Sequence, residues 1–354
     1  MMRLLTLLFL FAFSAQGNAL EVSIKLWKDS VMGALYNSST QKVVFNRPDK
    51  KKNYKIYLTD LSGKTERRLT WPEWSDDRQQ WAEEWTPDGK YLLCFVEKKE
   101  YVKEKIHKRK PVDATPGYGA YCDLWIIRSD GSMAWKILDL PNTYTSAIIH
   151  CAISRDGKKF AWSERIKAPK FGDFNLMAGS YVMRVADLTT DSIPKLSNTI
   201  TLQPGNTEAL NELDAISPDD SSLAFYSSFE SKNILATPVY LINIYTGKIK
   251  KLTDDSFAQS PTFTPDGKKI VYMTGSQCDI FPFEIQGADW WMMNPDGSEK
   301  LRLTYMNKKN HPHSVNHYRL AGCLSFIDNY SFLGGVMTKP LELEGMTVLV
   351  EIKP

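Results

Sequence analysis

The sequence has 354 residues, of which 43% are hydrophobic and 12% aromatic, and its formal net charge at pH 7 is +3. This composition is typical of a globular protein and excludes a disordered, collagen-like or polytopic membrane chain. The small net charge also argues against a nucleic-acid partner, because proteins that bind nucleic acids must neutralise many phosphates.

Residues 1–19 have the layout of a signal peptide. Arg3 precedes an apolar run from Leu4 to Ala15, and the small residues Gly17 and Ala19 lie before the expected cleavage point. The run is shorter than the roughly 20 apolar residues of a membrane-spanning helix. We therefore predict that residues 1–19 are cleaved and that residues 20–354 form one domain without a transmembrane segment. We therefore expect the protein to be periplasmic or secreted.

Two patterns alternate along the rest of the chain. The first is a tight turn followed by an apolar strand, seen clearly in TPDGKYLLCF from Thr86, SRDGKKFAWS from Ser154, SPDDSSLAFYS from Ser217 and TPDGKKIVYMT from Thr264. Weaker copies begin at Asn37 and Ser325. The second is a β-rich run, a polar turn and a second run that ends in Leu, as in VYLINIYTGKIKKLT from Val239 and WWMMNPDGSEKLRLT from Trp290.

Together the two patterns define six units of four antiparallel strands. Such units arranged in series are propeller blades. The sixth unit ends with the third strand, MTVLVEIKP, while LEVSIKLWKD near the N-terminus precedes the first unit. The sequence therefore predicts an all-β, six-bladed propeller in which the N-terminal strand completes the last blade and closes the ring.

These repeats resemble the TolB-type β-propeller, a family with a Pro-Asp variant of the WD-type blade. The resemblance covers the whole predicted mature chain and implies the propeller fold. TolB itself has a further α/β domain ahead of its propeller, whereas here the first blade begins almost directly after residue 19, so the resemblance is to the propeller alone. Other relatives of this kind include propellers attached to prolyl-type peptidases and metal-dependent pectate-oligomer lyases.

The loops are divided unequally between the two faces of the predicted ring. One face carries only tight turns, and the other carries nearly all the long segments. Binding and catalysis concentrate on irregular loops held by a rigid scaffold. We therefore expect the functional site on the loop-rich face, around the mouth of the central channel.

The connection between the first two units, WPEWSDDRQQWAEEW, combines four tryptophans with five carboxylates. Aromatic rings beside carboxylates can bind a sugar through stacking and hydrogen bonds. We interpret Trp81 and Trp85 as packing residues between blades. Trp71 and Trp74 have no periodic reason to be buried, so they join the candidate ligand-binding residues, which are Trp71, Trp74, Glu83, Glu84 and His150.

All five histidines fall on the loop-rich face, and HPHSVNH places three of them close together. Imidazole is the commonest metal ligand, and the pair His311 and His313 resembles the His-x-His pair of the lyase relatives. This gives a candidate site for a divalent metal ion at His311, His313, and His317 or His150. The alternative interpretation of these histidines is an exposed loop that binds nothing.

The five cysteines have no framework spacing. Cys94, Cys151 and Cys323 lie in apolar runs and are interpreted as buried hydrophobic residues. Cys94 and Cys122 belong to one repeat, so they are the pair to check for a disulfide.

Two functions remain open. The first is an exported binding or scaffold propeller whose loop-rich face takes an envelope protein or an oligosaccharide. The second is a metal-dependent carbohydrate-active enzyme, a lyase on acidic oligosaccharides, in which a histidine-bound ion assists removal of a proton. The catalytic residues of such an enzyme are not apparent from the sequence.

Overall fold

The structure is a computed structural model that describes residues 20–104, 119–170, 172–173, 176–254, 257–278, 285–314, 320–339 and 344–353. The predicted leader at residues 1–19, His107 and His317 lie outside the described residues. In the part of the chain that the structure describes, no helix has the length and apolar character needed to cross a bilayer.

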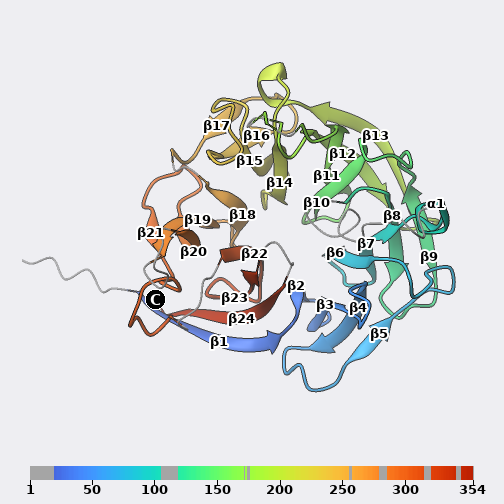
Figure 1. Cartoon of the computed structure of the whole chain (residues 1–354), viewed down its shortest axis with the longest axis horizontal. Coiled ribbons are helices and arrows are strands. Elements are labelled where there is room, and N and C mark those ends of the chain that lie inside the picture. The colour runs from blue at the N-terminus through green and yellow to red at the C-terminus, as the bar shows by residue number, and fades with distance from the viewer. Residues whose placement is uncertain are drawn as a thin grey trace, which may run out of the picture.

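The strands form a ring of six four-stranded antiparallel blades (Figure 1), of which blades 5 and 6 are continuous as one eight-stranded sheet. The strands of the first three blades are β2 (Met32–Asn37), β3 (Lys42–Pro48), β4 (Tyr54–Asp60) and β5 (Arg67–Leu69); β6 (Gln80–Trp85), β7 (Tyr91–Glu97), β8 (Cys122–Arg128) and β9 (Ala134–Leu138); and β10 (Ala147–Ile153), β11 (Lys159–Lys167), β12 (Ser180–Thr189) and β13 (Lys195–Leu202). A short helix, α1 (Lys99–Glu104), follows β7.

The remaining blades repeat this arrangement. Their strands are β14 (Asn211–Ile216), β15 (Ser222–Ser227), β16 (Val239–Asn243) and β17 (Ile249–Lys251); β18 (Gln259–Phe263), β19 (Ile270–Cys278), β20 (Ile285–Met293) and β21 (Leu301–Arg302); and β22 (Leu320–Phe326), β23 (Ser331–Lys339), β24 (Glu344–Lys353) and β1 (Glu21–Asp29). A short 3-10 helix, η2 (Pro204–Asn206), precedes β14. Blades 5 and 6 also meet through one parallel pair, Ala288 with Leu320.

The predicted closure of the ring is confirmed. β1 pairs antiparallel with β24, from Glu21 opposite Lys353 to Asp29 opposite Met346, and Figure 1 shows the first strand beside the last. The N-terminal strand thereby covers the edge that β24 would otherwise expose. The two ends of the chain hold each other in one sheet.

The repeated turns form because one carboxylate organises each of them. In blade 2 the Thr86 hydroxyl and the Lys90 N–H donate to Asp88 Oδ1 at 2.7 and 3.1 Å. Asp156, Asp219 and Asp266 accept the equivalent bonds in blades 3, 4 and 5. An Asp that accepts from the backbone two residues further on closes a tight turn. The turn pattern seen in the sequence therefore corresponds to a real hydrogen-bonded motif.

The hydrophobic core lies between the blades. Buried clusters join blades 1 and 2, 2 and 3, 3 and 4, 4 and 5, 5 and 6, and 6 and 1 in turn. Burial of apolar surface is the main stabilising contribution in such a protein. Each blade thus depends on both neighbours, and the innermost strands β2, β6, β10, β14, β18 and β22 are held rigidly around the channel (Figure 1).

Candidate functional site

Each innermost strand contains a β-bulge. In β6, Ala82 pairs with Cys94 and Glu84 with Leu93, so Glu83 is an extra residue without a partner in the ladder. The register shifts in the same way at His150, Asp214, Gly33–Ala34, Ser260–Pro261 and Gly322–Cys323. A bulge re-aims a side chain and is frequent next to functional sites.

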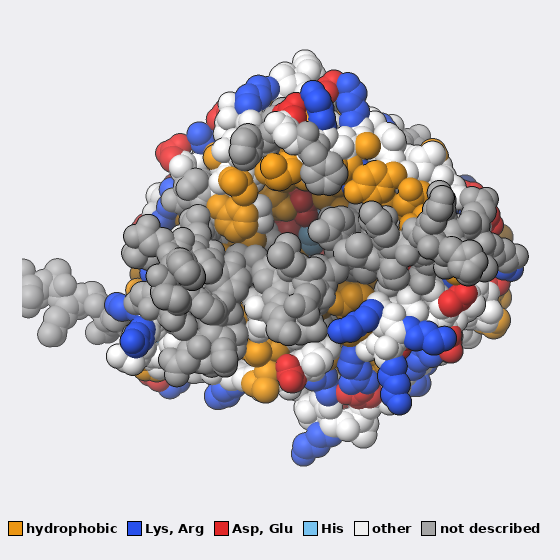
Figure 2. Space-filling view, in the orientation of Figure 1, with side chains coloured by type: hydrophobic (Ala, Val, Ile, Leu, Met, Phe, Trp, Pro, Cys, Tyr) orange, Lys and Arg blue, Asp and Glu red, His pale blue; other side chains and the backbone are white. Residues whose placement is uncertain are grey.

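The six bulges meet around one cavity of about 770 Å³ at the centre of the ring. Its lining includes one bulge residue from each blade, namely Gly33, Glu83, His150, Asp214, Ser260 and Cys323. Figure 2 shows the hollow with acidic side chains and a histidine at its floor and hydrophobic side chains around them. A large concave site with a few convergent polar groups in apolar walls is the usual form of a ligand pocket.

His150 is held between two carboxylates. Its Nδ1 lies 3.2 Å from Glu83 Oε1, and its Nε2 lies 2.9 Å from Glu212 Oε1. Burial lowers the pKa of His150, but electrostatic interactions and hydrogen bonds with Cys323 and Glu212 outweigh burial and raise this pKa well above its ordinary value. Both ring nitrogens of His150 therefore lie beside carboxylates, an arrangement that favours the charged form of the imidazole.

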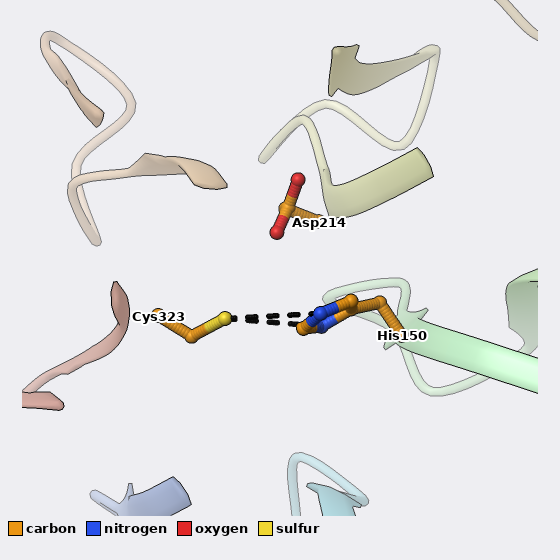
Figure 3. Close-up of side chains that lie close together, drawn as sticks. All are labelled: His150, Asp214 and Cys323. Atoms are coloured by element: carbon orange, nitrogen blue, oxygen red, sulfur yellow. Dashed lines mark hydrogen bonds between the residues drawn. The ribbon is translucent and has the colours of Figure 1, made fainter. Parts of the chain in front are cut away.

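Cys323 faces the same imidazole from the opposite blade (Figure 3). Its Sγ lies 3.8 Å from Nδ1 and 3.9 Å from Nε2 of His150, and 3.6 Å from the Ser260 hydroxyl. Asp214 approaches from blade 4, and its ligand atom, the Cys323 sulfur and a His150 nitrogen all lie within 4.8 Å of one another. Three different donor atoms, nitrogen, oxygen and sulfur, therefore converge from three blades.

Two further carboxyls of the cavity are strongly desolvated. Burial raises the pKa of Glu84 to about 8, although the Trp85 N–H donates to it at 2.8 Å. Burial also raises the pKa of Asp214 well above its ordinary value, against the opposing effect of His150. Carboxyl groups with raised pKa values in a cavity are candidates for ligand contacts or proton transfer.

Some of the residues proposed from the sequence are brought together, and others are not. Glu83, Glu84 and His150 all line the cavity. The expectation that Trp74 is available to a ligand is wrong, because Trp74 is 2% exposed and packs edge-on against Trp125, with ring centroids 5.8 Å apart. Trp71 packs against the same cluster and is only partly buried. Neither tryptophan lines the cavity.

The interpretation of Trp81 and Trp85 as packing residues is confirmed. Trp85 is buried between blades 1 and 2, and its indole N–H donates to the Leu35 carbonyl at 3.0 Å. Trp81 stacks edge-on against Tyr54 at 5.0 Å, and its N–H donates to Glu83 Oε2 at 2.8 Å. Trp81 therefore also fixes the orientation of a cavity carboxylate.

His311 and His313 lie away from the cavity, at the outer edge between blades 5 and 6. The Tyr305 N–H donates to His313 Nδ1 at 3.3 Å, and His313 Nε2 lies 2.9 Å from the Val22 carbonyl, to which it donates. Neither ring nitrogen of His313 is left for a metal in this arrangement. The structure also places His150 in the cavity instead of beside this pair. The predicted shared ion at His311, His313 and His150 is therefore not supported by the geometry.

The expectation that Cys323 is a buried hydrophobic residue is wrong. Cys94, Cys122 and Cys151 are buried, but Cys323 is exposed in the channel, and none of these four forms a disulfide. The bulge at Gly322–Cys323 turns the thiol inward. Sequence analysis also missed Asp214 and Ser260, although each lies just before a repeated turn, in the same part of its unit as Glu83 and His150.

No protein-family model and no curated protein matches the sequence. Solved structures do match. TolB from Acinetobacter baumannii shares 14% identity and a TM-score of 0.52 over 90% of this chain and 66% of that one. The putative TolB from Agrobacterium tumefaciens shares 13% identity and a TM-score of 0.52, over 95% of this chain and 99% of that one. An oligogalacturonate lyase in complex with manganese shares 14% identity and a TM-score of 0.51, over 94% of this chain and 91% of that one. The likeness shows a TolB-like propeller fold, and this chain spans just under two thirds of the Acinetobacter protein.

Proposed function

We propose that this TolB-like propeller is an exported binding module that takes a glycan into the central channel from its loop-rich face. The observation that carries the proposal is the group of three carboxyls, Glu83 and Glu84 from blade 2 and Asp214 from blade 4, within a cavity of about 770 Å³ that also has apolar walls. Carboxylates accept hydrogen bonds from sugar hydroxyls, and apolar walls pack on the carbon faces of the rings.

The scarcity of unpaired basic side chains in the cavity favours a neutral or amino-bearing glycan. Among the described lining residues, three are acidic, whereas the only basic ones are His150 and Arg155, and His150 is already paired with carboxylates. Burial raises the pKa of Glu84 and Asp214 and so favours their neutral forms. An oligosaccharide of uronates would nevertheless need several unpaired basic groups, and among the described lining residues only Arg155 offers one. This is the reason why we do not propose a lyase acting on acidic oligosaccharides, even though one structure of similar fold is an oligogalacturonate lyase.

The test is calorimetric titration of the tag-free protein, from residue 20 onward, with three probes of equal length. These are a neutral glucose oligosaccharide, an oligomer of glucosamine, and an oligogalacturonate. We expect binding of the neutral or the amino probe, and Glu83→Gln should weaken it about tenfold, because one charged hydrogen bond contributes about 1.5–3 kcal/mol.

Glu299→Gln is the matched control, since Glu299 is 70% exposed and bonds Lys269 far from the cavity; it should bind like the unmodified protein. Preference for oligogalacturonate, equal weakening in both variants, or no binding of any saccharide would each overturn the proposal. Binding of a basic peptide without any saccharide would instead favour a protein ligand.

Export is the second part of the proposal and rests on the sequence of residues 1–19. Protein recovered from the periplasm or medium of a bacterial host should have an intact mass that corresponds to a chain beginning at Leu20. Recovery of the full-length chain from the cytoplasm alone would contradict it.

A further inference from the structure

We propose that His150, Asp214 and Cys323 form a binding site for a transition-metal ion, best suited to Zn²⁺, at the floor of the central channel. The site lies in the same cavity as the proposed glycan site and shares Asp214 with it, but it goes beyond the proposed function, because its test requires no saccharide. Its residues come from the bulges of β10, β14 and β22, on three different blades.

The geometry is close to that of a tetrahedral centre. Zn–N bonds of about 2.0–2.1 Å and Zn–S bonds of about 2.3 Å place tetrahedral N and S ligands about 3.6 Å apart. The Cys323 sulfur lies 3.8 Å from His150 Nδ1. All three ligand atoms lie within 4.8 Å of one another, so an ion needs to draw them inward only slightly.

The donor set selects the kind of metal. Thiolate and imidazole ligands suit Zn²⁺ and other late transition metals, whereas Ca²⁺ and Mg²⁺ prefer sites made of oxygen atoms alone. Three protein ligands facing an open channel also leave a fourth position for water or a ligand, as in zinc sites that act on substrates. Cys323 can serve because its thiol is the exposed one among the four cysteines whose side chains the structure describes.

A second layer of contacts already orients the ligands. Glu212 Oε1 lies 2.9 Å from His150 Nε2, which leaves Nδ1 toward the ion. The Tyr226 hydroxyl hydrogen-bonds Glu212 in turn. A metal-ligating histidine typically gives its other N–H to a carboxylate in this way. When an ion binds, His150 Nδ1 would lose any proton that it carries and would coordinate the ion. This bond would replace its present contact with Glu83 Oε1, which lies 3.2 Å away.

Asp214 supplies an independent indication of a missing partner. Its Oδ2 is closed off from solvent and has no hydrogen-bond partner among the described residues. A buried carboxyl oxygen without a partner is costly, whether or not the group is ionised. Glu83 and Glu212 add further negative charge around His150, so a divalent cation would satisfy both the open oxygen and the local charge.

The backbone at His150 lies in the left-handed region. His150 has φ +43°, and two other bulge residues share this region, Ser260 with φ +51° and Gly33 with φ +58°. A side chain in this region costs on the order of 1–3 kcal/mol and tends to persist where function requires it. The strain places the imidazole in the channel, where the other two ligands can reach it.

The test starts with tag-free protein from residue 20 onward, stripped with a chelator and dialysed against Zn²⁺ or Co²⁺ in the absence of any saccharide. We expect about one equivalent of metal, and the Co²⁺ form should show thiolate-to-metal charge-transfer absorption. Cys323→Ser should remove this absorption, and Asp214→Asn should lower the affinity about tenfold or more.

The His311→Ala/His313→Ala double variant is the matched control and should retain both the metal and the absorption. Loss of metal in the double variant, an unchanged spectrum in Cys323→Ser, or no stoichiometric binding would each overturn the proposal. Thermal unfolding of every variant without metal shows whether it is folded.

A measurement on the unmodified protein keeps the test decisive if a variant fails to fold. Zn²⁺ should protect Cys323 from alkylation by iodoacetamide, as peptide mapping by mass spectrometry would show, and alkylation that Zn²⁺ leaves unchanged would contradict the site. No saccharide is present in these assays, so a negative result for the metal does not contradict the glycan proposal. A negative glycan titration likewise does not contradict the metal site.

Discussion

Deletion of residues 20–29, which removes β1, should prevent the protein from forming a stable ring. β1 forms the whole outer strand of blade 6, and its Val22 and Ile24 pack against the buried cluster of that blade. Each ladder hydrogen bond contributes about 1 kcal/mol net, and a typical domain has only about 5–15 kcal/mol of stability. The loss of the ladder, of this packing and of edge protection together should exceed that margin.

Circular dichroism during heating and size-exclusion chromatography measure this outcome. The deleted chain should aggregate or melt without cooperativity, and a synthetic peptide of residues 20–29 added in trans should restore a cooperative transition by pairing with β24. A deleted chain that melts like the unmodified one would show that closure by β1 is not required.

Two point substitutions in β1 separate packing from strand pairing. Ile24→Asp places a charge in the blade 6 cluster and should lower the free energy of unfolding by about 2–4 kcal/mol. Lys25 lies at the next position and reaches outward to Glu351 at 2.6 Å, with both side chains exposed. Lys25→Gln should therefore change stability by less than about 1 kcal/mol.

Glu84 should make the protein less stable as the pH rises from about 4.5 to about 8. The pKa of this carboxyl is about 8 in the folded protein, because burial disfavours its charged form, and 4.5 is its ordinary value. Between these values the folded state holds a proton that the unfolded state has released. The free energy of unfolding is therefore unaffected by this group below about pH 4.5. Between about pH 4.5 and about pH 8 the free energy of unfolding falls, by about 1.4 kcal/mol per pH unit at most.

Glu84→Gln should remove this part of the pH dependence, because the amide is neutral at every pH and its oxygen can still accept the Trp85 N–H bond. Chemical denaturation at several pH values measures the difference between the two proteins. They should be about equally stable at pH 4, where both side chains are neutral, and the variant should be the more stable at pH 9. Parallel profiles over the whole range would show that Glu84 ionises normally in the folded state.

Several features of the protein followed from the sequence alone. The turns at Asp88, Asp156, Asp219 and Asp266 are local motifs, in which an Asp bonds its own neighbourhood. Local motifs are visible in sequence, and their repetition gave the number of blades. The missing strand of the last unit and the spare strand at the N-terminus then predicted the closure that β1 and β24 form.

Burial of individual side chains was less predictable where no periodicity applied. Trp74 lies in an irregular connection, so its sequence position carried no sign that it packs against Trp125 in the cluster between blades 1 and 2. The proximity of His311 and His313 suggested a shared metal. Backbone groups of Val22 and Tyr305, one of them far away in the sequence, engage the ring of His313 instead.

Sequence patterns therefore predict the fold, the number of blades, the closure of the ring and three residues of the cavity, Glu83, Glu84 and His150. Asp214, Ser260 and Cys323 join them only in the folded ring. Strand and turn signals are short-range, because they arise from alternation and from local hydrogen bonds. The site instead depends on where a bulge falls in each of six strands and on ring closure, which brings residues from Gly33 to Cys323 around one axis.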